Sequence, residues 1–449
     1  MMCVSLTTTS LLYFWAELVS TVTPFATRIA ETAGAITWAV PVVSDEELSF
    51  PAEPTVLPTP WPRRNTECTS AFECFDPPES SDDAPERMRF AAAVVAEMAR
   101  SDEAISDLST FELSAETKEH LRPSSKTVVA ILSRRMDKLA FCIDVLNRLY
   151  PAIHNHDIIV FHAGEFDEED TLKLETLWPT LHIRVANLSE TPAFWSLPPL
   201  PTLRTFDLSK AEMQNFGMGY RLMCRFYGRA LFYFVYNLGY EWMIRFDDDS
   251  RVVTPIDYDL TERLEDRGAV YGYRLSHRDW PLAIRGCHDA VHEYILQMNV
   301  SPTMLYIDSN PHSLEGVFEP LWDPTAIDQG MASGWNPWLP YNNFFVTKLS
   351  FWMRREVQLF LFYVDLCGGF FYARWGDHII QGTALTMFAT RRELYWYDDF
   401  TYFHYPVMIS GNNDDPGPVI AFAGAQRLRI IRVGNNLLAA TPSYAVHMM

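Results

Sequence analysis

The stretch YEWMIRFDDDSR, residues 240–251, combines a strand pattern with a run of acids. In residues 240–246, large apolar side chains occupy every second position, which is the two-residue period of a β-strand. The carboxylates of residues 247–249 follow directly. Ligands of open α/β sheets bind just beyond the carboxyl ends of strands, and divalent cations that hold a diphosphate prefer carboxylate oxygens. The three acids therefore indicate either such a metal site or a solvated acidic turn.

The composition of the 449-residue chain predicts a large globular core. Hydrophobic residues make up 48% and aromatic residues 14%, which excludes global disorder. The formal net charge of -21 makes the chain a poor binder of nucleic-acid backbones, so we expect no nucleic-acid partner. A nucleotide pocket needs only a few local cations. The arginines available for one are Arg134, Arg135, Arg221, Arg225 and Arg374.

The seven cysteines form no recognisable metal-binding or redox motif. No Cys-x-x-Cys pair occurs, which argues against a zinc ribbon and a thioredoxin-type site. Because the number is odd, at least one thiol would be free or intermolecular in a secreted chain. Cys68 and Cys74 are spaced for a local disulfide, which the spacing alone does not establish.

The chain divides into four predicted regions. Residues 1–43 contain two moderately apolar pieces, but neither reaches the ~20 uninterrupted apolar residues of a membrane span. We interpret them as a weak signal-anchor or a leader. Residues 44–86 are rich in proline and acids and read as a stalk or linker. Residues 87–410 are expected to form the globular domain, with a core at 126–406, and residues 411–449 a C-terminal extension.

The start of this core alternates strand and helix patterns. Short apolar runs at 127–133, 157–162 and 181–186 are typical of buried parallel strands. Helical spacing occupies the intervals at 136–149 and 167–177. This order predicts one half of a doubly wound α/β fold. No Gly-x-Gly-x-x-Gly and no P-loop motif follows the first strand, which argues against a dinucleotide oxidoreductase and a P-loop enzyme.

The remaining elements follow from spacing and from helix breakers. An amphipathic helix is expected at 84–100 and an aromatic-rich helix at 220–234. Proline-rich residues 300–341 read as long loops. Asp377 is placed to cap the last of the helices. The other predicted elements are strands at 269–274 and 344–351 and helices at 352–366 and 378–389.

Four ordered blocks resemble a known family. They are YRLMCRF at 220–226, RFDDD at 245–249, GGFFYARWGD at 368–377 and YFHYP at 402–406. In this order they resemble glycosyltransferase family 15, the fungal GDP-mannose α-1,2-mannosyltransferases, over roughly residues 126–406. The Arg-Trp-Gly-Asp segment is the most specific part of the match.

The resemblance implies a fold, an activity and a location. The fold would be GT-A-like, a mixed central sheet flanked by helices, with an extended or disordered N-terminal stalk. The activity would be a Mn²⁺-dependent retaining transfer of mannose from GDP-mannose to a mannose-terminated glycan, in protein glycosylation or cell-wall mannan synthesis. The catalytic domain would lie in the Golgi lumen behind a membrane anchor. The acceptor, whether O-linked, N-linked or glycolipid, stays open.

The family pattern also assigns roles to single residues. Asp247 and Asp249 match the family's metal-binding acids, with Asp247 also facing the donor phosphates, and His404 matches a metal-ligating histidine. Asp377 matches an acid near the donor and acceptor sugars, and Tyr220 a tyrosine facing the active site. From the residues alone, His404 could equally be a loop histidine, Asp377 a helix cap and Tyr220 a core side chain.

Three arginines are the candidates for binding the donor phosphates. Arg134 and Arg135 follow the first predicted strand, where a nucleotide-facing residue would lie. Arg225 would face the phosphates or pair with an acid elsewhere. The sequence therefore gives these arginines a location near the donor rather than a defined contact.

Two departures from the family pattern concern activity. Asp247 stands where the family has glutamate, which keeps the charge and gives an Asp-x-Asp motif. Phe345 stands at the position of a family glutamate proposed as the nucleophile, and Ala373 replaces a second glutamate. The reaction would then use front-face attack or another acid, or the chain would be a catalytically weak member that binds mannan or a partner transferase. A phosphatase is disfavoured, because no nucleophile-bearing loop follows the first strand.

Overall fold

The computed structural model describes residues 74–76, 83–100, 111–279, 283–305, 338–404, 407–409, 429–433 and 436–440. All of these residues belong to one compact unit. The predicted leader at 1–43 lies outside the described residues, as do most of the predicted linker, of the loops at 300–341 and of the C-terminal extension. The proposed domain boundaries therefore stay predictions.

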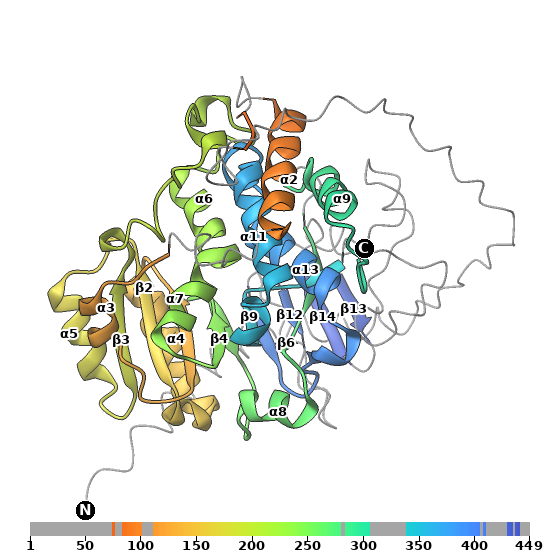
Figure 1. Cartoon of the computed structure of the whole chain (residues 1–449). Coiled ribbons are helices and arrows are strands. Elements are labelled where there is room, and N and C mark those ends of the chain that lie inside the picture. Colours follow the sequence, from red (N-terminus) through yellow and green to blue (C-terminus); the bar gives the residue numbers. More distant parts are fainter. Residues whose placement is uncertain are drawn as a thin grey trace, which may run out of the picture. The chain divides into compact units, whose positions relative to one another are not determined.

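A seven-stranded mixed sheet forms the centre of the fold (Figure 1). Its strand order is β10-β6-β9-β4-β1-β2-β3. The four neighbours β4, β1, β2 and β3 run parallel, whereas β9 is antiparallel to both β4 and β6. This arrangement confirms the predicted α/β class with a mixed sheet. The strands are β1 (Thr127–Leu132), β2 (Asp157–His162), β3 (His182–Asn187), β4 (Trp242–Phe246), β6 (Tyr271–Tyr273), β9 (Phe344–Lys348) and β10 (Leu394–Trp396).

Helices cover both faces of this sheet. Side chains of β1 alternate between two hydrophobic cores, because successive residues of a strand point to opposite faces. Val129 and Ile131 belong to the core that includes α4, and Val128 and Ala130 to the core that includes α7, α11 and α13. The helices are α2 (Ala84–Arg100), α3 (Ala115–His120), α4 (Met136–Leu149), α5 (Glu168–Leu177), α6 (Met218–Arg225), α7 (Leu231–Leu238), α8 (Leu260–Arg267), α9 (Cys287–Met298), α10 (Leu349–Trp352), α11 (Arg355–Cys367), α12 (Gly369–Tyr372) and α13 (Asp377–Phe388).

Local sequence signals place most of these elements within a residue or two. The helices predicted at 84–100 and 136–149 have those bounds in the structure. Helix α2 packs on α9 and α11 (Figure 1). Helix α11 ends at Cys367, and the capping residue Gly368 adopts a left-handed φ of 69°, which suits glycine after a helix C-terminus. The strand predicted at 344–351 is shorter, because α10 begins at its end.

The aromatic-rich helix predicted at 220–234 is interrupted. Helix α6 passes through a π-helical segment, η6 (Phe226–Ala230), into α7. Single π turns of this kind occur frequently at functional sites, because the wider turn redirects side chains. In this chain the segment carries Tyr227, whose ring lies under the cavity described below.

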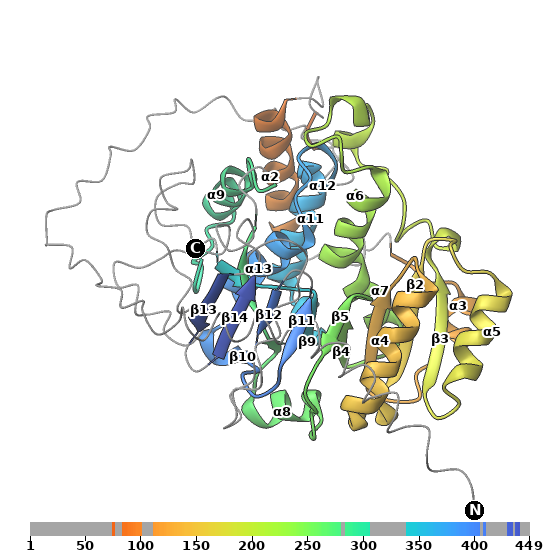
Figure 2. The ribbon, with the colours of Figure 1, turned by 180° about the vertical axis from the view of Figure 1, so that it is seen from behind.

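A second, smaller sheet begins directly after the three acids, because its strand β5 starts at Ser250. Its strand order is β13-β14-β12-β11-β5, and Figure 2 shows these strands side by side. Strands β5 and β11 pair antiparallel, with His404 opposite Ser250. This pairing brings the end of the family-like region back to the three acids. The strands are β5 (Ser250–Val252), β11 (Tyr402–His404), β12 (Val407–Ile409), β13 (Arg429–Val433) and β14 (Asn436–Ala440), and β7 (Ser276–Arg278) pairs separately with β8 (Trp338–Pro340).

Within the part of the chain that the structure describes, no helix is both long and apolar enough to cross a membrane.

Candidate active site

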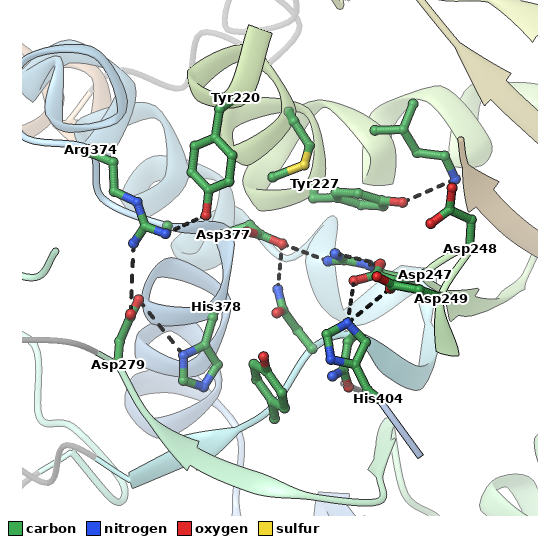
Figure 3. Close-up of a pocket in the computed structure, with 17 residues that line it drawn as sticks. Tyr220, Tyr227, Asp247, Asp248, Asp249, Asp279, Arg374, Asp377, His378 and His404 are labelled. Atoms are coloured by element: carbon green, nitrogen blue, oxygen red, sulfur yellow. Dashed lines mark hydrogen bonds and ion pairs between the residues drawn. The ribbon is translucent and has the colours of Figure 1, made fainter. Parts of the chain in front are cut away.

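A cavity of about 620 Å³ opens beyond the carboxyl ends of β1 and β4 (Figure 3). Most of its polar lining comes from the blocks that resemble the family. The lining residues are Leu132, Tyr220, Met223, Tyr227, Arg245, Asp247, Asp248, Asp249, Asp279, Tyr341, Asn342, Asn343, Arg374, Gly376, Asp377, His378 and His404.

The acidic run after β4 is a tight, hydrogen-bonded turn. The Asp247 amide donates to the Asn343 carbonyl at 3.0 Å, and the Ser250 amide donates to the Asp247 carbonyl at 2.9 Å. The middle acid, Asp248, accepts a 2.7 Å hydrogen bond from the Ser133 hydroxyl at the end of β1. The turn therefore separates Asp248, which faces β1, from the two outer acids.

Asp247, Asp249 and His404 converge on one point. His404 Nε2 lies 3.2 Å from Asp249 Oδ1 and 3.8 Å from Asp247 Oδ2. One donor atom from each residue lies within 4.8 Å of the other two. Two carboxylates and an imidazole at this spacing suit a divalent cation such as Mn²⁺, which accepts oxygen and imidazole ligands. The donor set therefore fits a metal ion.

The surroundings shift the acidity of the two outer acids in opposite directions. Burial raises the pKa of the Asp247 carboxyl to about 6, although the positive charge of Arg245 opposes the shift. The hydrogen bond from His404 is the main cause that lowers the pKa of Asp249 below its usual range. The ammonium group of Lys138, 3.3 Å from Asp249, acts in the same direction. Asp249 is thus ionised at neutral pH, and Asp247 is the acid that a modest fall in pH protonates.

We expect Mn²⁺ binding to weaken as the pH falls below about 6, because Asp247 must lose its proton to become a ligand. The folded-state pKa is raised, so protons compete with the metal in this range, at about tenfold in affinity per pH unit. Titration of donor-free protein with Mn²⁺, followed by the electron paramagnetic resonance of free Mn²⁺, measures this dependence. The variant Asp247→Asn should bind Mn²⁺ more weakly and with a shallower pH dependence. An unchanged slope in that variant would contradict the assignment.

Arg245 joins Asp247, one of the candidate metal ligands, to Asp377. Its Nε lies 2.9 Å from Asp247 Oδ1, and its Nη1 lies 2.6 Å from Asp377 Oδ2. The Asn342 amide also donates to Asp377 Oδ2, at 2.7 Å. Asp377 was expected to cap its helix, which is wrong: Gly376 is the N-cap residue, and no side-chain cap bond forms. The carboxylate instead binds Arg245 on β4 and Asn342 in the turn before β9.

Tyr220 lies on the opposite wall, in contact with Arg374 (Figure 3). Arg374 in turn lies 3.8 Å from Asp279, and its backbone has a left-handed φ of 67°, which is uncommon for a residue other than glycine. Burial raises the pKa of the Tyr220 hydroxyl above its usual range, so the group is a neutral donor or acceptor. His378, 4.0 Å from Asp279, completes this wall.

Arg225, one of the predicted phosphate-binding arginines, points away from the cavity. Its Nε and Nη2 contact the Asp365 carboxylate at 2.8–3.1 Å, and its side chain is 2% exposed. Arg229 contacts the same carboxylate. The predicted contact of Arg225 with the donor phosphates is therefore corrected. A buried acid on α11 holds this arginine within the helical layer.

Arg134 and Arg135 lie near the acids but outside the lining of the cavity. Their side chains are 80% and 61% exposed, and they pair with Glu165 and Asp137, respectively. They follow the end of β1, on the edge of the sheet that carries Asp248. Their contact with donor phosphates remains a proposal.

The comparisons with known proteins decide the family. Residues 83–415 match the family model described as glycolipid 2-alpha-mannosyltransferase. The chain belongs to this family. Among curated members, glycolipid 2-alpha-mannosyltransferase 1 of Candida albicans is 26% identical over 219 residues, 47% of each chain. Alpha-1,2 mannosyltransferase KTR1 of Saccharomyces cerevisiae is 24% identical over 307 residues, 65% of this chain and 71% of the relative. The chain spans about half the length of the first two curated relatives.

Two solved structures share the fold of this chain. Core-mannan synthase A of Aspergillus fumigatus, in a Mn/GDP form, aligns with a TM-score of 0.53 at 19% identity, over 66% of this chain and 78% of that one. Mannosyltransferase Ktr4p of Saccharomyces cerevisiae, in complex with GDP, aligns with a TM-score of 0.53 at 18% identity, over 74% of this chain and 84% of that one. The GT-A-like fold predicted from the resemblance is confirmed.

Phe345, which the resemblance places at the family's proposed nucleophile, does not line the cavity. Its side chain is 0% exposed and stacks on Tyr271 with ring centroids 5.1 Å apart. It lies directly opposite Arg245 in the β4–β9 pairing. In this member of the glycolipid 2-alpha-mannosyltransferase family, that position is therefore part of the hydrophobic core.

The sequence did not identify several residues that line this cavity. The sequence places Arg245 and Tyr227 only within a strand and a helix, and it gives Asn342, Asp279 and His378 no role. Arg245 had one usable signal: a charged residue on an otherwise apolar central strand, directly before the acids. The others carry no local signal, because each reaches the cavity only through tertiary packing.

Proposed function

We propose that this chain is a Mn²⁺-dependent retaining α-1,2-mannosyltransferase that moves mannose from GDP-mannose to a mannose-terminated glycan. The convergence of Asp247, Asp249 and His404 at the edge of a 620 Å³ cavity carries the proposal. Membership of the family adds the donor, since its relatives are named as mannosyltransferases and one solved member is a Mn/GDP form. The acceptor would enter from the side of Tyr220 and Asp377.

The chain's own residues would bind and orient the two sugars. Asp247, Asp249 and His404 would hold Mn²⁺, which when bound neutralises the charge that develops on the departing diphosphate. Arg134 and Arg135 would contact the donor from the end of β1. Their exposed side chains leave room to move toward a bound nucleotide.

Asp377 would orient the attacking hydroxyl. Its Oδ2 is already held by Arg245 and Asn342, so Oδ1 is the oxygen left to accept a hydrogen bond from a sugar hydroxyl. Tyr220, whose buried hydroxyl is protonated at neutral pH, would donate or accept a hydrogen bond beside it. In a front-face reaction the C1–phosphate bond breaks, the acceptor oxygen bonds to C1 on the same face, and the hydroxyl proton passes to the leaving phosphate. This route does not require a carboxylate at Phe345.

The location we propose is the Golgi lumen, behind a membrane anchor in residues 1–43. Cys74 takes part in a disulfide, which agrees with an oxidising secretory compartment. The sequon Asn187-Leu-Ser189 would be usable there.

We expect the protein to transfer mannose from GDP-mannose to methyl-α-mannoside, and EDTA to abolish this transfer. Added Mn²⁺ should restore it, because the site combines two carboxylates with an imidazole. Product formation is followed by mass spectrometry, and anomeric configuration by NMR. UDP-sugars serve as the control donors. Turnover without metal, or with UDP-sugars alone, would contradict the proposal.

A second candidate is a glycan- or partner-binding family member with little catalytic activity. The burial of Phe345 favours it, since no carboxylate is available at that position. Calorimetry separates the two candidates. GDP-mannose binding that is never followed by transfer or donor hydrolysis would support the binding protein.

A further inference from the structure

Arg245 is a buried cation in the middle of the central sheet. It lies on β4, between β1 and β9, and its side chain is 4% exposed. Burial by itself would lower the pKa of a guanidinium, but the charges of Asp247 and Asp377 raise it above the usual value. The group therefore keeps its charge within the sheet. A buried charge of this kind is costly unless it is fully paired.

The two partners of Arg245 come from separate parts of the chain. Asp247 directly follows β4, whereas Asp377 begins α13. The guanidinium reaches Asp247 Oδ1 at 2.9 Å and Asp377 Oδ2 at 2.6 Å, so it spans the gap between the two acids. In Asp247 the remaining oxygen, Oδ2, is the one that lies 3.8 Å from His404 Nε2. Arg245 thus binds one oxygen of each carboxylate, Asp247 Oδ1 and Asp377 Oδ2. The second oxygen of each acid is left for groups in the cavity.

Aromatic rings fix the guanidinium in this place. Its central carbon lies 3.3 Å from the centroid of the Tyr227 ring, on the π-helical segment, and 6.0 Å from that of Phe345. The Tyr227 hydroxyl is itself fixed, because it accepts a 3.1 Å hydrogen bond from the Leu132 amide. A planar cation held over a ring by a cation–π contact has little freedom to rotate.

We propose that Arg245 is a positioning residue that sets the orientation of Asp247 at the metal relative to Asp377 at the acceptor. This inference rests on the proposed function of the same cavity. The reaction needs the donor phosphates and the acceptor hydroxyl at a defined separation, and a displacement of about 1 Å can cost 10²-fold in rate. A single rigid cation that binds one acid on each side holds the two acids at a fixed distance from each other.

Phe345 also helps Arg245 to bind both acids. Residues directly opposite on antiparallel strands lie within about 5.5 Å between Cβ atoms, so a carboxylate at position 345 would compete for Arg245. The phenylalanine offers no hydrogen-bond acceptor and leaves both ends of the guanidinium for Asp247 and Asp377. In this chain Phe345 therefore supports the bridge.

The test compares Arg245→Met and Arg245→Lys with the wild type. Arg245→Met removes the bridge, and we expect kcat for mannose transfer to fall about 10²-fold and Mn²⁺ affinity about tenfold. A lysine keeps the charge, but its compact ammonium cannot form the planar two-sided contact. Arg245→Lys should therefore recover thermal stability while kcat stays close to that of Arg245→Met.

The matched control is Arg263→Met. Arg263 also lies over a tyrosine, at 3.7 Å from the Tyr258 centroid, and pairs with Asp399 at 3.7 Å, but it does not line the cavity. Its kcat and Mn²⁺ affinity should match those of the wild type. Differential scanning calorimetry on all variants separates lost stability from lost positioning.

Two results would overturn the inference. One is an Arg245→Lys protein with wild-type kcat, which would mean that only the charge matters. The other is an Arg245→Met protein that is less stable but keeps wild-type kcat and Mn²⁺ affinity, which would make the bridge structural. If the wild type transfers no mannose, the proposed function fails. The positioning of Asp247 is then decided by Mn²⁺ affinity alone, which should still fall in Arg245→Met.

Discussion

Replacing Asp249 by asparagine is expected to lower kcat/KM for mannose transfer by about 10³-fold, because a bound metal supplies several kcal/mol of charge stabilisation at the departing diphosphate. The substitution keeps the shape of the side chain and removes the charge. Asp249 Oδ1 lies 3.2 Å from His404 Nε2, and both residues belong to the candidate metal-binding group. Mn²⁺ titration and initial rates, measured on the same preparation, give the two quantities that should fall together.

Asp248→Asn is the matched control for this prediction. It removes the same charge from the adjacent residue, but Asp248 binds the Ser133 hydroxyl and does not belong to the metal-binding group. The loss of kcat/KM in Asp248→Asn should therefore be much smaller, less than about tenfold. Equal losses in the two variants would show that the general negative charge of the turn matters, and would contradict a defined metal site.

Replacing Asp365 by asparagine is expected to lower the free energy of unfolding by about 3–5 kcal/mol, because two buried arginines lose their counter-charge. The Asp365 carboxylate is 0% exposed and contacts both Arg225 and Arg229. Both guanidinium groups also lie 5.1 Å from the centroid of the Phe111 ring. Urea denaturation, followed by far-ultraviolet circular dichroism, measures the change.

Asp137→Asn provides the control, since it breaks an Arg–Asp pair at the surface. Asp137 and Arg135 are 68% and 61% exposed, so water screens their interaction and no measurable change in stability is expected. If Asp365→Asn were as stable as this control, the buried cluster would not hold α6, η6 and α11 together. Arg225 would then again be a candidate for binding the donor phosphates.

Local patterns were sufficient for the elements whose signal is contained in a short stretch. The alternation in residues 240–246 predicted β4, and the spacing of Leu139, Ile143 and Leu146 predicted α4 with its bounds. Such periods report which face of an element is buried, and this depends on residues only a few positions apart. The order of strand and helix patterns gave the α/β class for the same reason.

The contacts that build the candidate site were decided by tertiary structure. His404 reaches Asp249 because β11 pairs with β5, and Asp377 meets Arg245 because α13 begins beside β4. The sequence left Arg225 either at the donor or paired with an acid elsewhere, and the structure shows that Asp365 on α11 holds it in the core. A charged side chain carries no period that names its partner, since the partner is chosen by the packing of elements far apart in the chain. The sequence by itself therefore determined the elements and the family, while tertiary packing determined which acids and cations meet.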